Sequence, residues 1–85
     1  MTEIRGKNVL ITGAACGIGR RMAHKIADLG GTVVGWDLHQ PNLDRLGSDL
    51  KDSSGRDAYG YVCDVSDKAK VYEVADQVKK NVGEI

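Results

Sequence analysis

The sequence predicts an α/β fold in which three strand–helix units follow one another (βαβαβα) and the strands form a parallel sheet. Two observations lead to this prediction. Short apolar runs alternate with segments whose apolar residues recur every three or four positions, and the connections between these segments are short. Because strand–helix–strand crossovers are right-handed, we expect three layers, with helices packed on the sheet and the strand order 3-2-1. The 85 residues show no internal repeat, linker or low-complexity segment, so we expect one unit.

The first unit is predicted to contain a strand over residues 8–12, a glycine-rich turn and a helix over residues 17–29. The strand is a short apolar run that meets a glycine, as a buried strand does. In the helix the apolar positions are spaced by four, four and three residues, which places them on one face, and two consecutive glycines end it. This face consists of Ile18, Met22, Ile26 and Leu29, and beside it Ala23 and Ala27 allow a close approach to the sheet.

The second and third units repeat this pattern. A second strand is predicted over residues 32–36, closed by Asp37, and a third, rich in Tyr and Val, over residues 58–63. Pro41 suits the first turn of the second helix, and Ser66 is predicted to be the N-cap of the third. The apolar faces are Leu43, Leu46 and Leu50 in the second helix, and Val71, Val74, Ala75, Val78 and Val82 in the third, which Gly83 ends.

Three glycines lie between the first strand and the first helix: Gly13, Gly17 and Gly19. The first allows a tight turn out of the strand, the second lets the backbone approach a pyrophosphate, and the third lets the helix pack closely. The free N–H groups near Gly17 and Ile18, together with the helix dipole, favour phosphate. This context predicts a Rossmann-type dinucleotide-binding turn, and the alternative is a glycine-rich turn without a ligand.

Carboxylates follow the second and third strands, at the edge of the sheet where open α/β folds bind ligands. Asp37 is placed to accept hydrogen bonds from the adenosine ribose hydroxyls. Because it would repel a 2′-phosphate, and because Cys16 and Leu38 are not basic, we predict NAD as the cofactor, with NADP disfavoured. Asp64 can accept from the adenine amino group and Val65 can pack on the ring. The alternatives are a helix-capping role for the first acid and support of a helix start for the second.

Composition and charge argue against several classes of function. Twelve basic and twelve acidic residues cancel, so no nucleic-acid surface is expected. No apolar run approaches the roughly 20 residues that span a bilayer, and the N-terminus lacks the apolar segment of a secretory signal. We therefore expect a cytoplasmic protein with reduced thiols and no membrane segment in this chain. No metal is expected; the residues that could form a metal site are Cys16, Cys63, His24 and His39.

Together, these residues resemble those of the short-chain dehydrogenase/reductase family, over nearly the whole chain. The resemblance rests on Thr12-Gly13-x-x-x-Gly17-Ile18-Gly19, on Asp37 and on Asp64-Val65. Residues 9–13 with Trp36-Asp37 are also similar to the steroid- and retinol-type alcohol dehydrogenases. The resemblance implies that the pyrophosphate and nicotinamide ribose are held by Gly13, Gly17, Ile18 and Gly19. It implies that Cys16 faces the adenosine ribose and that Asp37 and Leu38 bind this ribose and flank adenine. It also implies that Asp64 and Val65 hold the adenine.

Family members transfer hydride between nicotinamide and an alcohol or carbonyl carbon. The resemblance therefore implies an NAD(H)-dependent oxidoreductase with a small-molecule alcohol or carbonyl substrate. The family's catalytic Ser, Tyr-x-x-x-Lys and helix Asn have no counterpart here, since no tyrosine is followed four positions later by lysine. We expect residues 1–85 to be the N-terminal part of an NAD(P)-binding Rossmann domain without its catalytic half. Two alternatives stay open: a non-catalytic module for NAD or ADP-ribose, and a methyltransferase-type fold for S-adenosylmethionine, whose glycine loop is usually spaced G-x-G-x-G.

The resemblance also bears on self-association. The first strand would normally pair with a fourth strand, so residues 8–12 are expected to form an exposed edge in this chain. Such an edge invites strand pairing between chains. We expect self-association or low solubility of this chain, and a homo-oligomer in the complete enzyme.

The lack of a tyrosine–lysine pair predicts that the purified 85-residue chain does not oxidise alcohols. A tyrosine needs a nearby cation to lower its pKa from about 10 before it can act as a general base. Binding of NAD should be weak because the nicotinamide side of the site is absent. We expect a dissociation constant near millimolar, which corresponds to a binding free energy of about 4 kcal/mol. The measurement is NADH absorbance with a panel of alcohols and a protein-free blank. Turnover above that blank would contradict the prediction.

Overall fold

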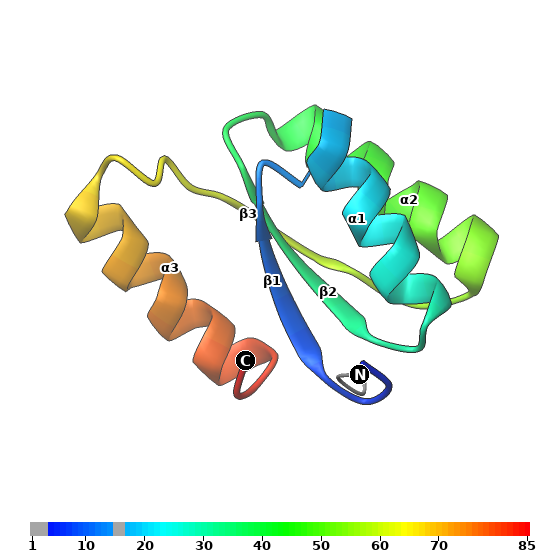
Figure 1. Cartoon of the computed structure of the whole chain (residues 1–85). Coiled ribbons are helices and arrows are strands. Elements are labelled where there is room, and N and C mark those ends of the chain that lie inside the picture. Colours follow the sequence, from blue (N-terminus) through cyan, green and yellow to red (C-terminus); the bar gives the residue numbers. More distant parts are fainter. Residues whose placement is uncertain (1–3, 15–16) are drawn as a thin grey trace.

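The computed structural model describes residues 4–14 and 17–85, and within them three strands alternate with three helices (Figure 1). The elements are β1 (Asn8–Thr12), α1 (Gly17–Asp28), β2 (Thr32–Asp37), α2 (Gln40–Ser54), β3 (Tyr59–Val62) and α3 (Lys68–Asn81). Each element expected from the sequence is present, and no strand boundary differs from its expected position by more than one residue. The α/β class is confirmed.

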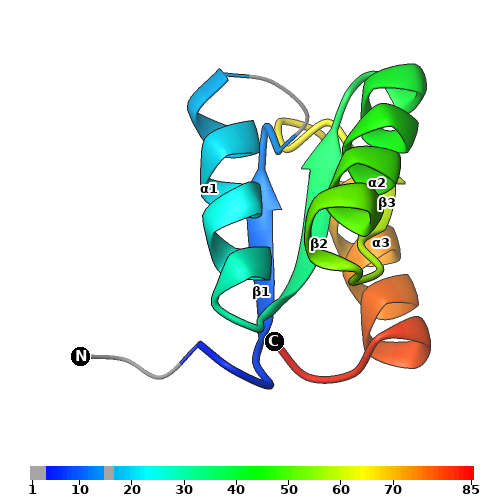
Figure 2. The same cartoon turned by 90° about the vertical axis from the view of Figure 1, so that its right-hand side faces the viewer.

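The strands form one parallel sheet with β2 at its centre. β1 pairs with β2 so that Leu10 lies opposite Val34, and β2 pairs with β3 so that Val34 lies opposite Tyr59. Because all three strands run in the same direction, their carboxyl ends and the loops that follow them lie at one edge of the sheet (Figure 2). This edge holds the candidate site.

The helices cover both faces of the sheet, with α1 and α2 on one side and α3 on the other (Figure 1). Successive residues of a strand point to opposite faces, so β2 contributes Val33 to one apolar cluster and Val34 and Trp36 to the other. The cluster beneath α1 and α2 contains Ile11, Ala14, Ala23, Ala27, Val33, Leu46 and Leu50. The cluster beneath α3 contains Val34, Trp36, Cys63, Val74 and Val78. The expected three layers are therefore present.

Two glycines let α2 and the glycine turn lie close to the sheet. A Cβ atom on Gly35 would lie 3.0 Å from the Cβ of Ala14, and one on Gly60 would lie 3.2 Å from the Cβ of Leu43. Both distances are shorter than ordinary carbon–carbon contacts, which favour about 3.5–4.0 Å. A side chain at either glycine would push this layer outward and loosen the packing at the carboxyl edge.

Helix α1 meets the sheet through its alanines and Ile26, whereas two of its larger apolar residues stay exposed. Ala23 and Ala27 are buried, whereas Ile18 is 76% exposed and Met22 is 51% exposed. Ile18 and Met22 lie on the side of α1 that extends past β1, where the described residues provide no further strand. A groove of about 360 Å³ lies between this side of α1 and β1. Its lining residues are Val9, Leu10, Ile11, Thr12, Ile18, Gly19 and Met22.

Helix α3 is capped by Asp67, and the prediction that Ser66 is its N-cap is wrong by one residue. The Asp67 carboxylate accepts a hydrogen bond from the N–H of Lys70 at 3.1 Å. Aspartate at this position satisfies one of the free N–H groups of the first turn. Ser66 instead donates its hydroxyl hydrogen to the side chain of Asp64 at 2.7 Å. The serine therefore belongs to the loop at the carboxyl edge and not to the helix.

The exposed apolar side of α1 predicts that a charge there reduces self-association. We expect Met22→Lys to lower the apparent mass in light scattering, because a lysine beside the β1 edge opposes pairing between chains. The side chain is half-exposed, so the free energy of unfolding should change by about 0.5 kcal/mol or less. Tyr72→Lys, on the 66% exposed surface of α3, is the matched control. An equal drop in mass for both variants would count against a role of this groove.

Candidate functional site

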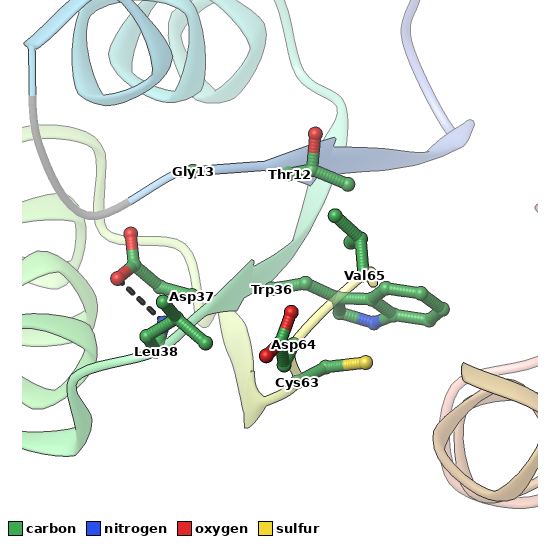
Figure 3. Close-up of a pocket in the computed structure, with 8 residues that line it drawn as sticks. All are labelled: Thr12, Gly13, Trp36, Asp37, Leu38, Cys63, Asp64 and Val65. Atoms are coloured by element: carbon green, nitrogen blue, oxygen red, sulfur yellow. Dashed lines mark hydrogen bonds between the residues drawn. The ribbon is translucent and has the colours of Figure 1, made fainter. Parts of the chain in front are cut away.

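A pocket of about 370 Å³ lies at the carboxyl edge of the sheet, where the ends of all three strands meet (Figure 3). One part of its lining comes from the end of β1, a second from the end of β2 and a third from the loop after β3. The lining residues are Thr12, Gly13, Trp36, Asp37, Leu38, Cys63, Asp64 and Val65. Residues more than fifty positions apart in sequence thus share one cavity.

The backbone at the end of β2 holds the two neighbouring segments in place. The carbonyl oxygen of Trp36 accepts a hydrogen bond from the N–H of Gly13 at 2.7 Å. The carbonyl oxygen of Asp37 accepts one from the N–H of Cys63 at 2.9 Å. The pocket wall is therefore fixed by main-chain hydrogen bonds, which do not depend on side-chain rotamers.

The glycine turn needs glycine for two different reasons. Gly13 and Gly17 have φ angles of +65° and +58°, a region that L side chains rarely adopt, although a Cβ atom would meet nothing within 4 Å at either position. Gly19 differs, because a Cβ atom there would overlap the carbonyl group of Gly13. We predicted that Gly19 allows close packing of helix and sheet; the nearest obstacle is the backbone of the turn itself.

Asp37, at the end of β2, is held by its own chain neighbours. Its Oδ1 accepts hydrogen bonds from the N–H of Leu38 at 2.7 Å and from the N–H of His39 at 3.3 Å. This local turn fixes the direction of the carboxylate at the pocket wall (Figure 3). The side chain of Leu38 is 67% exposed and also lines the pocket, so it offers an apolar surface beside the acid.

Asp64, in the loop after β3, is held in the same manner. Its Oδ1 accepts from the N–H of Ser66 at 2.9 Å and from the Ser66 hydroxyl at 2.7 Å. These two hydrogen bonds stabilise the charged form and hold the pKa of Asp64 below its usual value. Next to it Val65 is 59% exposed, and it lines the pocket as a second apolar surface.

The structure brings together five of the nine residues predicted for the cofactor site: Gly13, Asp37, Leu38, Asp64 and Val65 line the pocket. Ile18 and Gly19 line the groove beside β1 instead, and Gly17 lies at the start of α1 without lining either cavity. Cys16 lies outside the described residues.

Three pocket residues were not among the predicted site residues: Thr12, Trp36 and Cys63. Each occupies or adjoins the last position of a strand, so the prediction that ligands bind at strand ends could have identified them. Trp36 is buried, and its Nε1 has no hydrogen-bond partner among the described residues. Burial raises the pKa of the Cys63 thiol, so it stays protonated and unreactive at neutral pH.

The residues that the structure describes hold neither a metal-ligand cluster nor a membrane-spanning helix. These residues contain no group of three or more His, Cys, Asp or Glu side chains that could hold a metal ion. None of the described helices is long and apolar enough to cross a membrane.

The family model described as short chain dehydrogenase matches residues 7–85. The chain belongs to this family. Short-chain dehydrogenases are oxidoreductases, and the resemblance seen in the glycine turn and the two acids is confirmed at the level of the family. Human epidermal retinol dehydrogenase 2 is 40% identical over 83 residues, which are 98% of this chain and 27% of the relative. The chain spans about a quarter of the length of the curated relatives it matches.

Solved structures of short-chain dehydrogenases share the fold. A short-chain dehydrogenase/reductase from Burkholderia phymatum in complex with NAD has a TM-score of 0.91 and 36% identity, covering 100% of this chain and 30% of that protein. The L-sorbose reductase from Gluconobacter frateurii, complexed with NADPH and L-sorbose, has a TM-score of 0.88 and 26% identity, covering 96% of this chain and 32% of that protein. Relatives of the same fold therefore bind either dinucleotide.

The overlap at Gly19 predicts that the turn does not tolerate a methyl group there. We expect Gly19→Ala to cost about 2–3 kcal/mol of unfolding free energy, which lowers the Tm by about 10–20 °C for a domain of this size. Gly47→Ala, inside α2, is the matched control, because a Cβ atom there meets nothing within 4 Å. In the control, the free energy of unfolding should rise by about 0.5–1 kcal/mol, because alanine has a higher helix propensity than glycine. Thermal denaturation followed by circular dichroism measures both; an unchanged Tm for Gly19→Ala would show that the turn relaxes freely.

Proposed function

We propose that residues 1–85 form the N-terminal part of an NAD(P)-binding domain and that the pocket at the carboxyl edge binds the adenosine portion of NAD(H). The observation that carries this proposal is the convergence of Gly13, the first glycine of the turn, and two locally held carboxylates on one pocket. The volume of about 370 Å³ falls in the range of small-molecule sites, about 300–1,000 Å³.

Each part of the pocket suits a different part of the ligand. Asp37 accepts hydrogen bonds from the two ribose hydroxyls, which are donors of the right kind for a fixed carboxylate. The exposed side chains of Leu38 and Val65 offer apolar surfaces between which the adenine ring lies. The glycine turn, at the start of α1, presents backbone N–H groups and the positive end of the helix dipole to the pyrophosphate.

The preference for NAD over NADP is part of the proposal. Two carboxylates line the pocket, and neither lysine nor arginine is among the described residues that line it. A 2′-phosphate beside Asp37 would meet like charge, and such contacts cost several kcal/mol. Solved relatives include one in complex with NAD and one in complex with NADPH, so family membership does not decide between the two cofactors. The proposed preference for NAD therefore rests on the pocket residues of this chain.

The complete protein, in this proposal, transfers hydride between NAD(H) and a small-molecule alcohol or carbonyl compound. Membership of the short-chain dehydrogenase family supports this activity. Bound NAD(H) supplies the hydride acceptor or donor. The residues described above bind and orient the adenosine end of the cofactor, and none of them is proposed to exchange a proton with the substrate.

Titration with NAD and NADP tests the proposal. The single tryptophan lines the pocket, so its indole N–H resonance reports occupancy in NMR titrations even at millimolar affinity. We expect NAD and ADP-ribose to shift this resonance, and NADP to bind at least about tenfold more weakly. Asp37→Asn keeps an oxygen acceptor for the turn but removes the charge, so it should reduce the preference for NAD by about tenfold.

The control for this experiment is Asp57→Asn, which changes net charge equally. Asp57 pairs with Lys51 at 3.2 Å on the surface and lies outside the pocket. Its substitution should leave the ratio of the two affinities unchanged. Equal affinity of the unsubstituted chain for NAD and NADP would contradict the proposed preference, and lack of any shift with ADP-ribose would contradict the site.

A further inference from the structure

Ser66 makes contacts that neither the helix nor the pocket wall explains. Both of its hydrogen-bond donors, the backbone N–H and the hydroxyl, are directed to the same carboxylate oxygen of Asp64. The helix that follows begins with Asp67 as its N-cap, so the serine hydroxyl is not needed there. Ser66 does not line the pocket, whereas its partner Asp64 does.

The two hydrogen bonds restrict an otherwise exposed side chain. An aspartate on the surface of a loop samples several rotamers, and each of these directs the carboxylate differently. Contacts of 2.9 Å and 2.7 Å to Oδ1 select one orientation, and the second is a short charge-assisted bond. The other oxygen, Oδ2, has no hydrogen-bond partner in the part of the chain that the structure describes. Asp64 itself lines the pocket, beside Val65 (Figure 3).

The orientation also fixes which chemical groups the carboxylate accepts. An ionised carboxylate has only acceptors, so it favours an amino group and opposes a carbonyl oxygen at the same place. An aspartate is ionised at neutral pH, and the hydrogen bonds from Ser66, which lower the pKa of Asp64, favour this acceptor-only form further. A purine with an amino group at C6 therefore fits beside Oδ2 better than one with an oxo group.

We propose that Ser66 is a positioning residue that holds Asp64 for selection of adenine over oxopurines. This inference rests on the proposed function, since it concerns how the same pocket recognises the base of its dinucleotide. In this proposal Ser66 does not contact the base, and it affects base selection by orienting the Asp64 carboxylate. Its hydroxyl supplies one of the two hydrogen bonds, and the backbone N–H supplies the other.

The test compares NAD with nicotinamide hypoxanthine dinucleotide, in which an oxo group replaces the adenine amino group. Dissociation constants come from NMR titrations of the 85-residue chain, followed at the indole N–H of Trp36. The unsubstituted chain should prefer NAD. Ser66→Ala should reduce the ratio of the two affinities by about three- to tenfold, mainly through weaker binding of NAD. Ser66→Thr retains the hydroxyl and should restore the ratio.

A control separates positioning from helix stability. Asp67→Ala removes the N-cap of α3 and should lower the Tm, yet it should leave the affinity ratio unchanged. A Ser66→Ala chain that binds NAD with an unchanged ratio would overturn the role of Ser66 and leave the proposed function standing. Absence of NAD binding by the unsubstituted chain would overturn the proposed function and this inference with it.

Discussion

The contact between Gly19 and the carbonyl group of Gly13 is the constraint on which the site depends. No side chain fits between them, so α1 begins directly against the turn that leaves β1. The turn can then hydrogen-bond to the end of β2, through the N–H of Gly13 and the carbonyl of Trp36. This places the helix start and Asp37 on one edge of the sheet, although they come from different strand–helix units.

Local hydrogen bonds place both acids of the pocket. Asp37 and Asp64 each bind an N–H group two residues further along the chain, which is the arrangement that aspartate favours in turns. These local hydrogen bonds tie the orientation of both carboxylates to the conformation of their loops. Two carboxylates so placed are hydrogen-bond acceptors, which is the chemistry that the proposed binding of ribose hydroxyls and an adenine amino group requires.

Much of this arrangement could be predicted from the sequence. The alternation of apolar runs and helical periodicity gave the order of elements, and the rule that parallel sheets bind ligands at strand ends led to Asp37 and Asp64. Periodicity could not show which side of α1 packs, because alanines and larger apolar residues form adjacent stripes and only the position of the sheet decides between them. The N-cap of α3 was misassigned because Ser66 and Asp67 are both good caps, and a contact with Asp64 determines which one is used.

The division of the interior into two apolar clusters has a consequence for how the protein opens. Among the described residues, β2 places fully buried side chains in both clusters, and Leu10 of β1 and Tyr61 of β3 also pack against the cluster beneath α3. Separate packing units of this kind can unfold locally at different free energies. Transient detachment of α3 would uncover the indole of Trp36 from below while the glycine turn stayed bonded to the sheet. Local opening of that layer would thus leave the glycine turn preformed and loosen the part of the pocket formed by Trp36 and Cys63.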